Sequence, residues 1–131
     1  MQRLLPSIKI KRIYEVASSD DGFRILVDRL WPRGIAKEKA QVDLWLKDIA
    51  PSTELRTWFG HDPENWCEFQ KRYAQELMQQ KATLEELRRI TKDKKVVTLL
   101  FGAADQQHNN AVALKTFLTA GAEKKKQSKT Y

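Results

Sequence analysis

Cysteine is almost absent from the chain, which contains only Cys67 among its 131 residues. A single cysteine cannot form an internal disulfide, and such sparse use is typical of proteins in a reducing compartment. Long apolar runs are also missing, because no segment approaches the roughly 20 residues that a membrane-spanning helix needs. The apolar stretch within residues 1–6 is too short for a signal peptide. We therefore expect a cytoplasmic protein with no membrane partner.

Histidine is scarce as well. The two histidines, His61 and His108, stand 47 residues apart. With one cysteine besides, no spacing in the chain is typical of a metal site. We expect no metal and no cofactor.

The length and composition indicate one folded domain. At 131 residues the chain is long enough to bury a core, and 41% hydrophobic with 31% charged residues excludes a disordered chain. The formal net charge is +7, of which Lys124, Lys125, Lys126 and Lys129 supply four. We predict a domain over residues 1–121 and a basic, disordered tail over 122–131. The tail is either a solvated terminus or an arm that binds anions or nucleic acid.

Alternating and unbroken apolar segments predict four strands, near residues 8–16, 23–29, 42–47 and 95–101. The first two strands could form a hairpin, and a helix over 42–49 is the alternative to the third strand. The last strand should be central, because its unbroken apolar run needs cover on both faces. The fold class is therefore α/β: a single domain with a small sheet of about four strands and helices packed on it. The strand order is not predicted.

Helices are expected between and after these strands. One helical turn is predicted over 36–40, a helix from Ser52 to Gly60, and a helix over 63–80 that begins at Asp62-Pro63. A T-x-x-E capping box at Thr83 predicts the start of the next helix. The final helix should run over 106–120 and stop at Gly121.

Spacing along these helices assigns Trp58 and Trp66 to the core. Cys67 is expected to be a buried structural thiol, with a nucleophile as the alternative. Trp31 and Trp45 do not fit an apolar stripe. They are the aromatic residues expected to floor a ligand pocket or to stack on a base.

The first candidate site follows the second strand. Asp28, Arg29, Trp31 and Arg33 lie within six residues, and Pro32 makes the segment rigid. An aspartate beside arginines can orient a guanidinium to bind a phosphate or carboxylate. The alternative is a local ion pair that fixes the loop to the domain.

The second candidate site follows the last strand. Asp105 is a predicted helix cap, and His108, Asn109 and Asn110 come directly after it, at a position where α/β sheets bind ligands. His108 can act as a general acid or base, so His108 and Asp28 are the predicted catalytic residues. The predicted ligand-binding residues are Arg29, Trp31, Arg33, Trp45, Asp105, Asn109 and Asn110. The alternative is an Asn-rich helix start that only satisfies backbone groups. A Gly-His-Asp-Pro turn at His61 is explained by capping alone, with a site as the weaker alternative.

Four separated segments carry a recognisable pattern: VDRLWPRG (27–34), LWLKDIAPS (44–52), RTWFGHD (56–62) and TLLFGAAD (98–105), the last followed by HNNA (108–111). With these segments, over residues 8–118, the chain resembles the YeaO-like proteins, a bacterial domain-of-unknown-function family. The resemblance implies a compact α/β domain of uncharacterised activity. Related members of the wider family have a cysteine-histidine-arginine sequence where this chain has Gln107-His108-Asn109. Thiol chemistry therefore does not carry over, whereas the histidine does.

Three functions fit these features. The first is binding of a small anionic or phosphate-bearing ligand at a basic aromatic pocket, with or without hydrolase or transferase chemistry. The second is a nucleic-acid-binding or regulatory module that uses the basic surface and tail. The third is a protein-interaction domain without catalysis, which needs only exposed Trp31 and Trp45. Whether the protein is an enzyme, and its oligomeric state, are left open.

Overall fold

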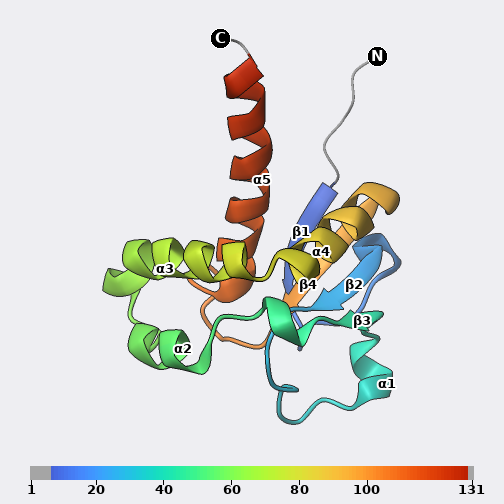
Figure 1. Cartoon of the computed structure of the whole chain (residues 1–131). Coiled ribbons are helices and arrows are strands. Elements are labelled where there is room, and N and C mark those ends of the chain that lie inside the picture. The colour runs from blue at the N-terminus through green and yellow to red at the C-terminus, as the bar shows by residue number, and fades with distance from the viewer. Residues whose placement is uncertain (1–6, 130–131) are drawn as a thin grey trace.

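Four parallel strands form the centre of the structure, a computed structural model that describes residues 7–129 and, for side chains, residues 7–120. The sheet has the order β1-β4-β2-β3, with all neighbours parallel (Figure 1). Its strands are β1 (Ser7–Arg12), β2 (Phe23–Leu26), β3 (Leu44–Trp45) and β4 (Val96–Phe101). The predicted α/β class with a small four-stranded sheet is confirmed.

The last strand is central, as its apolar run predicts. Leu99 pairs with Ile10 of β1 on one side and with Ile25 of β2 on the other. The alternative of a hairpin between the first two strands is wrong, because β4 lies between them and both pair with it in parallel. The third strand is shorter than predicted, since β3 spans only Leu44–Trp45 and a 3₁₀ turn, η2 (Lys47–Ile49), follows it.

Several helix boundaries follow from local capping. α1 (Lys37–Ala40) is the predicted single turn, and α2 (Thr53–Phe59) begins where the Ser52 hydroxyl accepts from the Leu55 N–H. Asp62 caps η3 (Pro63–Asn65), which leads into α3 (Trp66–Gln79). These short-range contacts depend on a few adjacent residues, which is why the sequence predicts them.

Two predicted helix starts are wrong. α4 (Lys81–Asp93) begins before Thr83, so the proposed capping box lies inside the helix, and only Gln80 separates α4 from α3. α5 (Asn110–Lys129) begins later than residue 106, because Asn109 and not Asp105 caps it. The predicted stop of this helix at Gly121 is also wrong, because α5 continues to Lys129. The side chains of residues 122–131 lie outside the described ones, so the predicted disorder of this tail stays a prediction.

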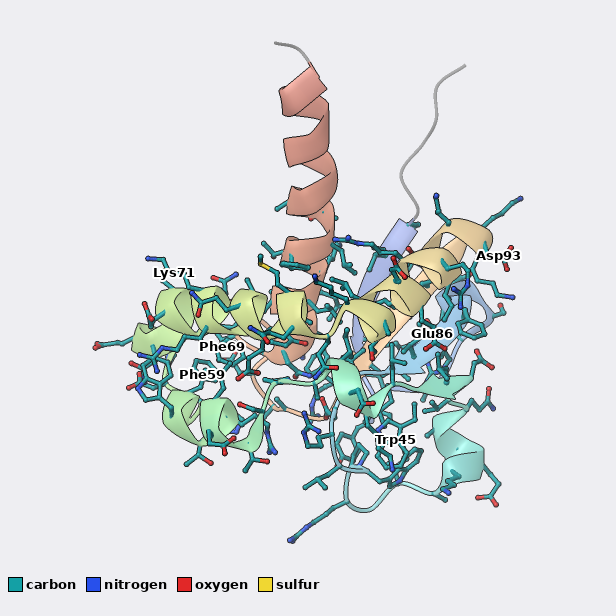
Figure 2. All side chains as sticks on the ribbon, in the orientation of Figure 1. Trp45, Phe59, Phe69, Lys71, Glu86 and Asp93 are labelled. Carbon is teal, nitrogen blue, oxygen red and sulfur yellow. The ribbon has the colours of Figure 1, made fainter. Side chains whose placement is uncertain are left out.

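The main core lies between the sheet and helices α2 to α5. Ile25 and Leu99 contribute from the strands, and Phe59 and Phe69 stack between α2 and α3 with ring centroids 4.4 Å apart (Figure 2). A smaller cluster on the other face contains Leu26 and Leu100 and packs against Trp31 and Trp45. Within the described residues, no helix is long and apolar enough to cross a membrane.

Two predicted core residues are exposed. Trp58 is 37% exposed, because Leu55 and Phe59 form the buried side of α2, and the Arg72 guanidinium lies 4.2 Å from its ring centroid. Cys67 is exposed because it precedes the buried Phe69 by two positions, more than half a helical turn. The prediction of a buried structural thiol is therefore wrong. Trp66 does pack against the core.

Candidate functional site

A pocket of about 480 Å³ lies beyond the carboxyl ends of β2 and β4. In parallel sheets this edge is where ligands bind, because loops and helix N-termini meet there. Segments far apart in the sequence form its walls, and its lining comprises Tyr14, Asp28, Arg29, Leu30, Trp31, Pro32, Arg33, Ala50, Pro51, Arg56, Thr57, Phe59, His61, Phe69, Gly102, Ala103, His108, Asn109 and Asn110. The structure thus brings both sequence-predicted clusters into one cavity.

Asp28 joins three elements at the floor of the pocket. Its Oδ2 accepts a hydrogen bond from the Gly102 N–H at 2.9 Å, and its Oδ1 accepts from Asn110 Nδ2 at 3.1 Å. The same Asn110 amide donates to the Val27 carbonyl at 2.9 Å. Burial raises the pKa of Asp28, while these two donors and the charge of Arg56 oppose the rise. Both carboxylate oxygens are therefore engaged in holding the ends of β2, β4 and α5 together.

Gly102 allows this close approach. A Cβ at residue 102 would lie 3.3 Å from Asp28 Oδ2 and 3.6 Å from Pro32 Cβ. The Pro32 distance is an ordinary van der Waals contact, whereas the Asp28 distance is tight, so a side chain at residue 102 would require a small shift of the carboxylate.

Two tryptophans fix the loop that follows β2. Trp31 Nε1 donates to the Ile35 carbonyl and Trp45 Nε1 to the Asp28 carbonyl, each at 2.8 Å. The two rings meet edge to face, with centroids 5.5 Å apart. Trp31 lines the pocket, whereas Trp45 lies outside its lining and supports the loop. Trp45 is the one predicted ligand-binding aromatic that the structure does not place in the cavity.

The three pocket arginines differ in what their side chains already bind. Arg29 donates to the carbonyls of Ala50 at 3.1 Å and Pro51 at 3.5 Å, and its buried Nε finds no acceptor within residues 7–120. In the same part of the chain, neither Arg33 nor Arg56 uses its guanidinium in a hydrogen bond or ion pair, and both residues are exposed. Arg33 and Arg56 are therefore the cations available to a ligand.

Asp105 holds His108 at the wall. Asp105 Oδ1 accepts from the N–H groups of Gln107 and His108, and Oδ2 lies 3.0 Å from His108 Nδ1. The Gln107 N–H and the contacts with His108 hold the pKa of Asp105 below its usual value. In the neutral ring this arrangement keeps the proton on Nδ1 and leaves Nε2 as the free nitrogen. His108 lines the pocket, and Asp105 stands behind it.

Asn109 is buried, 3% exposed, and engaged in local contacts. Its Oδ1 accepts from the Val112 N–H at 3.0 Å, and its Nδ2 donates to the Asp105 carbonyl at 2.9 Å. These contacts match the alternative of an Asn-rich helix start that satisfies backbone groups.

Several lining residues were missed by the sequence analysis. Arg56 and Thr57 come from α2, and Tyr14 follows β1. For Arg56 the one available signal was its place in the segment RTWFGHD. His61, for which the sequence favoured capping and left a site as the weaker alternative, also lines the wall, with a positive φ of 58°. Tyr14 had no signal, because the sequence does not reveal which loop ends beside β2.

The chemistry of the lining suits an anion. Among the side chains that the structure describes, it contains three arginines, two histidines and one aspartate, with no lysine, cysteine or glutamate. Its only side-chain hydroxyls are those of Thr57 and Tyr14. Within the described residues, no group of three or more histidine, cysteine, aspartate or glutamate side chains could hold a metal ion.

Comparison with known proteins gives a family and no activity. A family model described as the inactive DUF488-N3 subclade matches residues 7–131. An uncharacterised protein of Mycobacterium tuberculosis is 43% identical over 111 residues, which cover 85% of this chain and 92% of that protein. The uncharacterised protein YeaO of Escherichia coli is 43% identical over 112 residues, covering 86% and 96%. No solved structure matches the chain.

Proposed function

The chain belongs to the inactive DUF488-N3 subclade, and from this premise we propose that it binds a small anionic or phosphate-bearing ligand without transforming it. The pocket at the strand ends is the binding site in this proposal. We leave hydrolase and transferase chemistry out, because the family is described as inactive and both carboxylate oxygens of Asp28 are engaged in hydrogen bonds.

The availability of Arg33 and Arg56 carries the proposal. Within residues 7–120 their guanidinium groups have no protein partner, yet they line a cavity whose one aspartate is already engaged. A guanidinium binds phosphate or carboxylate with two parallel charge-assisted hydrogen bonds, which are stronger than neutral ones. Two such groups beside one cavity favour an anion over a neutral ligand.

The other polar residues take supporting roles in this proposal. Asp28 is a positioning residue, because both its oxygens hold the floor. His108, held by Asp105, supplies an additional hydrogen bond to the anion when its ring is protonated, because only then does Nε2 carry a hydrogen as well as Nδ1. Arg29 contributes its charge while its NH2 group stays on the Ala50 carbonyl.

Isothermal titration calorimetry with inorganic phosphate and with citrate tests the proposal. Arg33→Ala and Arg56→Ala should each weaken binding by roughly 10- to 150-fold, the equivalent of about 1.5–3 kcal/mol for a charged hydrogen bond. Arg89→Ala is the matched control, since Arg89 is also exposed but lies on α4 outside the pocket. Equal affinity of all four proteins, or no binding at all, would refute the proposal.

The nucleic-acid alternative predicts a different dependence. Binding driven by the lysine tail should fall with salt at a slope of about −0.9 per phosphate contact on duplex DNA. It should also vanish when residues 123–131 are removed, and Arg56→Ala should leave it intact. Tight oligonucleotide binding that is lost with the tail would favour this alternative.

A further inference from the structure

Tyr14 is an exposed aromatic ring that is nevertheless held in place. Its side chain lines the pocket and is 41% exposed, although large aromatic residues are normally well buried. Its hydroxyl donates to the Arg33 carbonyl at 2.7 Å, which ties the ring to the loop after β2. The ring therefore forms a fixed, flat surface in the wall of the cavity.

One face of this ring is backed by an arginine that is itself fixed. The Arg12 guanidinium carbon lies 4.8 Å from the Tyr14 ring centroid. Arg12 Nε donates to the Ala103 carbonyl at 2.8 Å and NH2 to the Gly102 carbonyl at 3.4 Å. Because hydrogen bonds to backbone carbonyls hold both members of the stack, a ligand that lies on Tyr14 orders little further side-chain freedom, which lowers the entropic cost of binding.

The other aromatic residues of the lining are less available. Phe59 is 5% exposed and Phe69 is 2% exposed, and they stack on each other. Trp31 contacts the Trp45 ring, and Lys37 Nζ lies 5.9 Å from its ring centroid. Among the tyrosine, tryptophan and phenylalanine residues of the lining, Tyr14 is thus the most exposed, since Trp31 is half-buried.

The volume of the cavity also exceeds what a bare anion needs. About 480 Å³ lies within the range of pockets that hold drug-sized organic ligands, roughly 300–1,000 Å³. A ligand that fills it with one anionic end has space for an organic group, and the exposed apolar surface of Tyr14 and Leu30 lies in the same wall.

We propose that the ligand is a phosphate monoester that carries a flat ring, of the class of free nucleoside monophosphates, with its ring stacked on Tyr14 and its phosphate bound by Arg56. This inference rests on the proposed function, because it names the ligand class of the same pocket. Stacking of a base on an aromatic side chain tolerates any base, so the site selects for a ring and a phosphate rather than for a sequence.

Calorimetry with three probes tests the two halves separately: adenosine 5′-monophosphate, ribose 5-phosphate, which lacks the base, and adenosine, which lacks the phosphate. Tyr14→Leu should weaken adenosine monophosphate binding by roughly 5- to 150-fold, the equivalent of about 1–3 kcal/mol of stacking, and leave ribose 5-phosphate unchanged. Arg56→Ala should weaken both phosphates. Tyr14→Phe keeps the ring and should retain most of the affinity for adenosine monophosphate.

Trp58→Leu is the matched control, because Trp58 is another exposed aromatic with an arginine against its ring, outside the pocket lining. It should leave all affinities unchanged, and far-ultraviolet circular dichroism should establish that each variant is folded. Loss of adenosine monophosphate binding in Tyr14→Leu but not in Tyr14→Phe supports the stacking, even if Tyr14→Leu is somewhat less stable.

Three outcomes would overturn the inference. Equal affinity of the wild type for ribose 5-phosphate and adenosine monophosphate would show that the base does not contribute to binding, while the anion site would still stand. A 5′-phosphorylated oligonucleotide that binds more tightly than the mononucleotide would show that the ligand is a nucleic-acid end rather than a free nucleotide. Failure of every phosphate to bind would overturn the proposed function as well.

Discussion

Replacing Asp28 with alanine should destabilise the domain, because this carboxylate joins two strand ends to the last helix. The variant loses the hydrogen bonds from the Gly102 N–H and from Asn110 Nδ2. Asn110 keeps its bond to the Val27 carbonyl, but Gly102 has no second acceptor in the described part of the chain. An unsatisfied buried donor costs about 1–3 kcal/mol.

An opposing term reduces this loss. Burial raises the pKa of Asp28, so the ionised carboxylate is itself unfavourable in its site, and alanine removes that cost. The hydrogen-bond loss should still prevail, because both oxygens have donors at 2.9–3.1 Å. We expect the free energy of unfolding to fall by about 2 kcal/mol.

Urea denaturation followed by circular dichroism measures the change, and a constant slope of free energy against urea shows that the unfolding reaction is the same. Asp28→Asn separates charge from hydrogen bonding: its oxygen can accept from Gly102, but its amide then faces the Asn110 amide, donor against donor. Asp28→Asn should therefore also lower the free energy of unfolding, although it removes the buried charge. Asp48→Ala, at an exposed aspartate of η2, is the control and should change stability by less than about 0.5 kcal/mol. An Asp28→Ala protein as stable as the wild type would refute the claim that Asp28 holds the ends of β2, β4 and α5 together.

Two further predictions concern the opposite end of the sheet. Gly22→Ala should destabilise by more than about 3 kcal/mol, because φ is +67° and a Cβ would lie 2.2 Å from the Val96 carbonyl oxygen; thermal melting checks it, and a small shift would contradict the contact. Burial alone would raise the pKa of Asp21, but hydrogen bonds from Ser18, Lys11 and Arg24 hold it below its usual value. Asp21 therefore contributes stability that is complete above the unfolded pKa of about 3.9 and is lost as the pH falls through the lower folded value. Melting temperatures of the wild type and Asp21→Asn should converge as the pH falls below about 4, and a difference that does not change with pH would show that this carboxylate is not responsible.

The sequence predicts those parts of the fold that depend on adjacent residues. The segment Val96–Phe101, apolar apart from Thr98, identifies the central strand, and Ser52 and Asp62 mark helix starts through bonds to nearby N–H groups. The order of the strands is different, because it depends on packing between distant segments. A parallel pair such as β1 and β4 leaves no turn signature between its members.

The candidate site divides in the same way. Asp28 comes two residues after β2 and His108 seven residues after β4, and the general rule for the carboxyl ends of parallel strands brings them together. Arg56 and Tyr14 reach the pocket from α2 and from the loop after β1, and no local pattern indicates which helix face or loop turns toward β2. Trp45 shows the converse: its position off the apolar stripe suggested a ligand, whereas its indole N–H binds the Asp28 carbonyl. An aromatic residue off the apolar stripe indicates that its side chain makes a specific contact, but the sequence does not show whether that contact is with a ligand or with the protein itself.

The central claim is that the cavity at the strand ends binds anions through Arg33 and Arg56. Heteronuclear NMR titration of the full-length protein with inorganic phosphate tests this claim most directly, because it locates the site without assuming it. We predict saturable shifts of the backbone amide signals of residues 28–31, 33–34, 56–61, 102–103 and 108–110, and their loss in Arg56→Ala. Shifts confined to α4 and the C-terminal half of α5, or no shifts at all, would contradict the account.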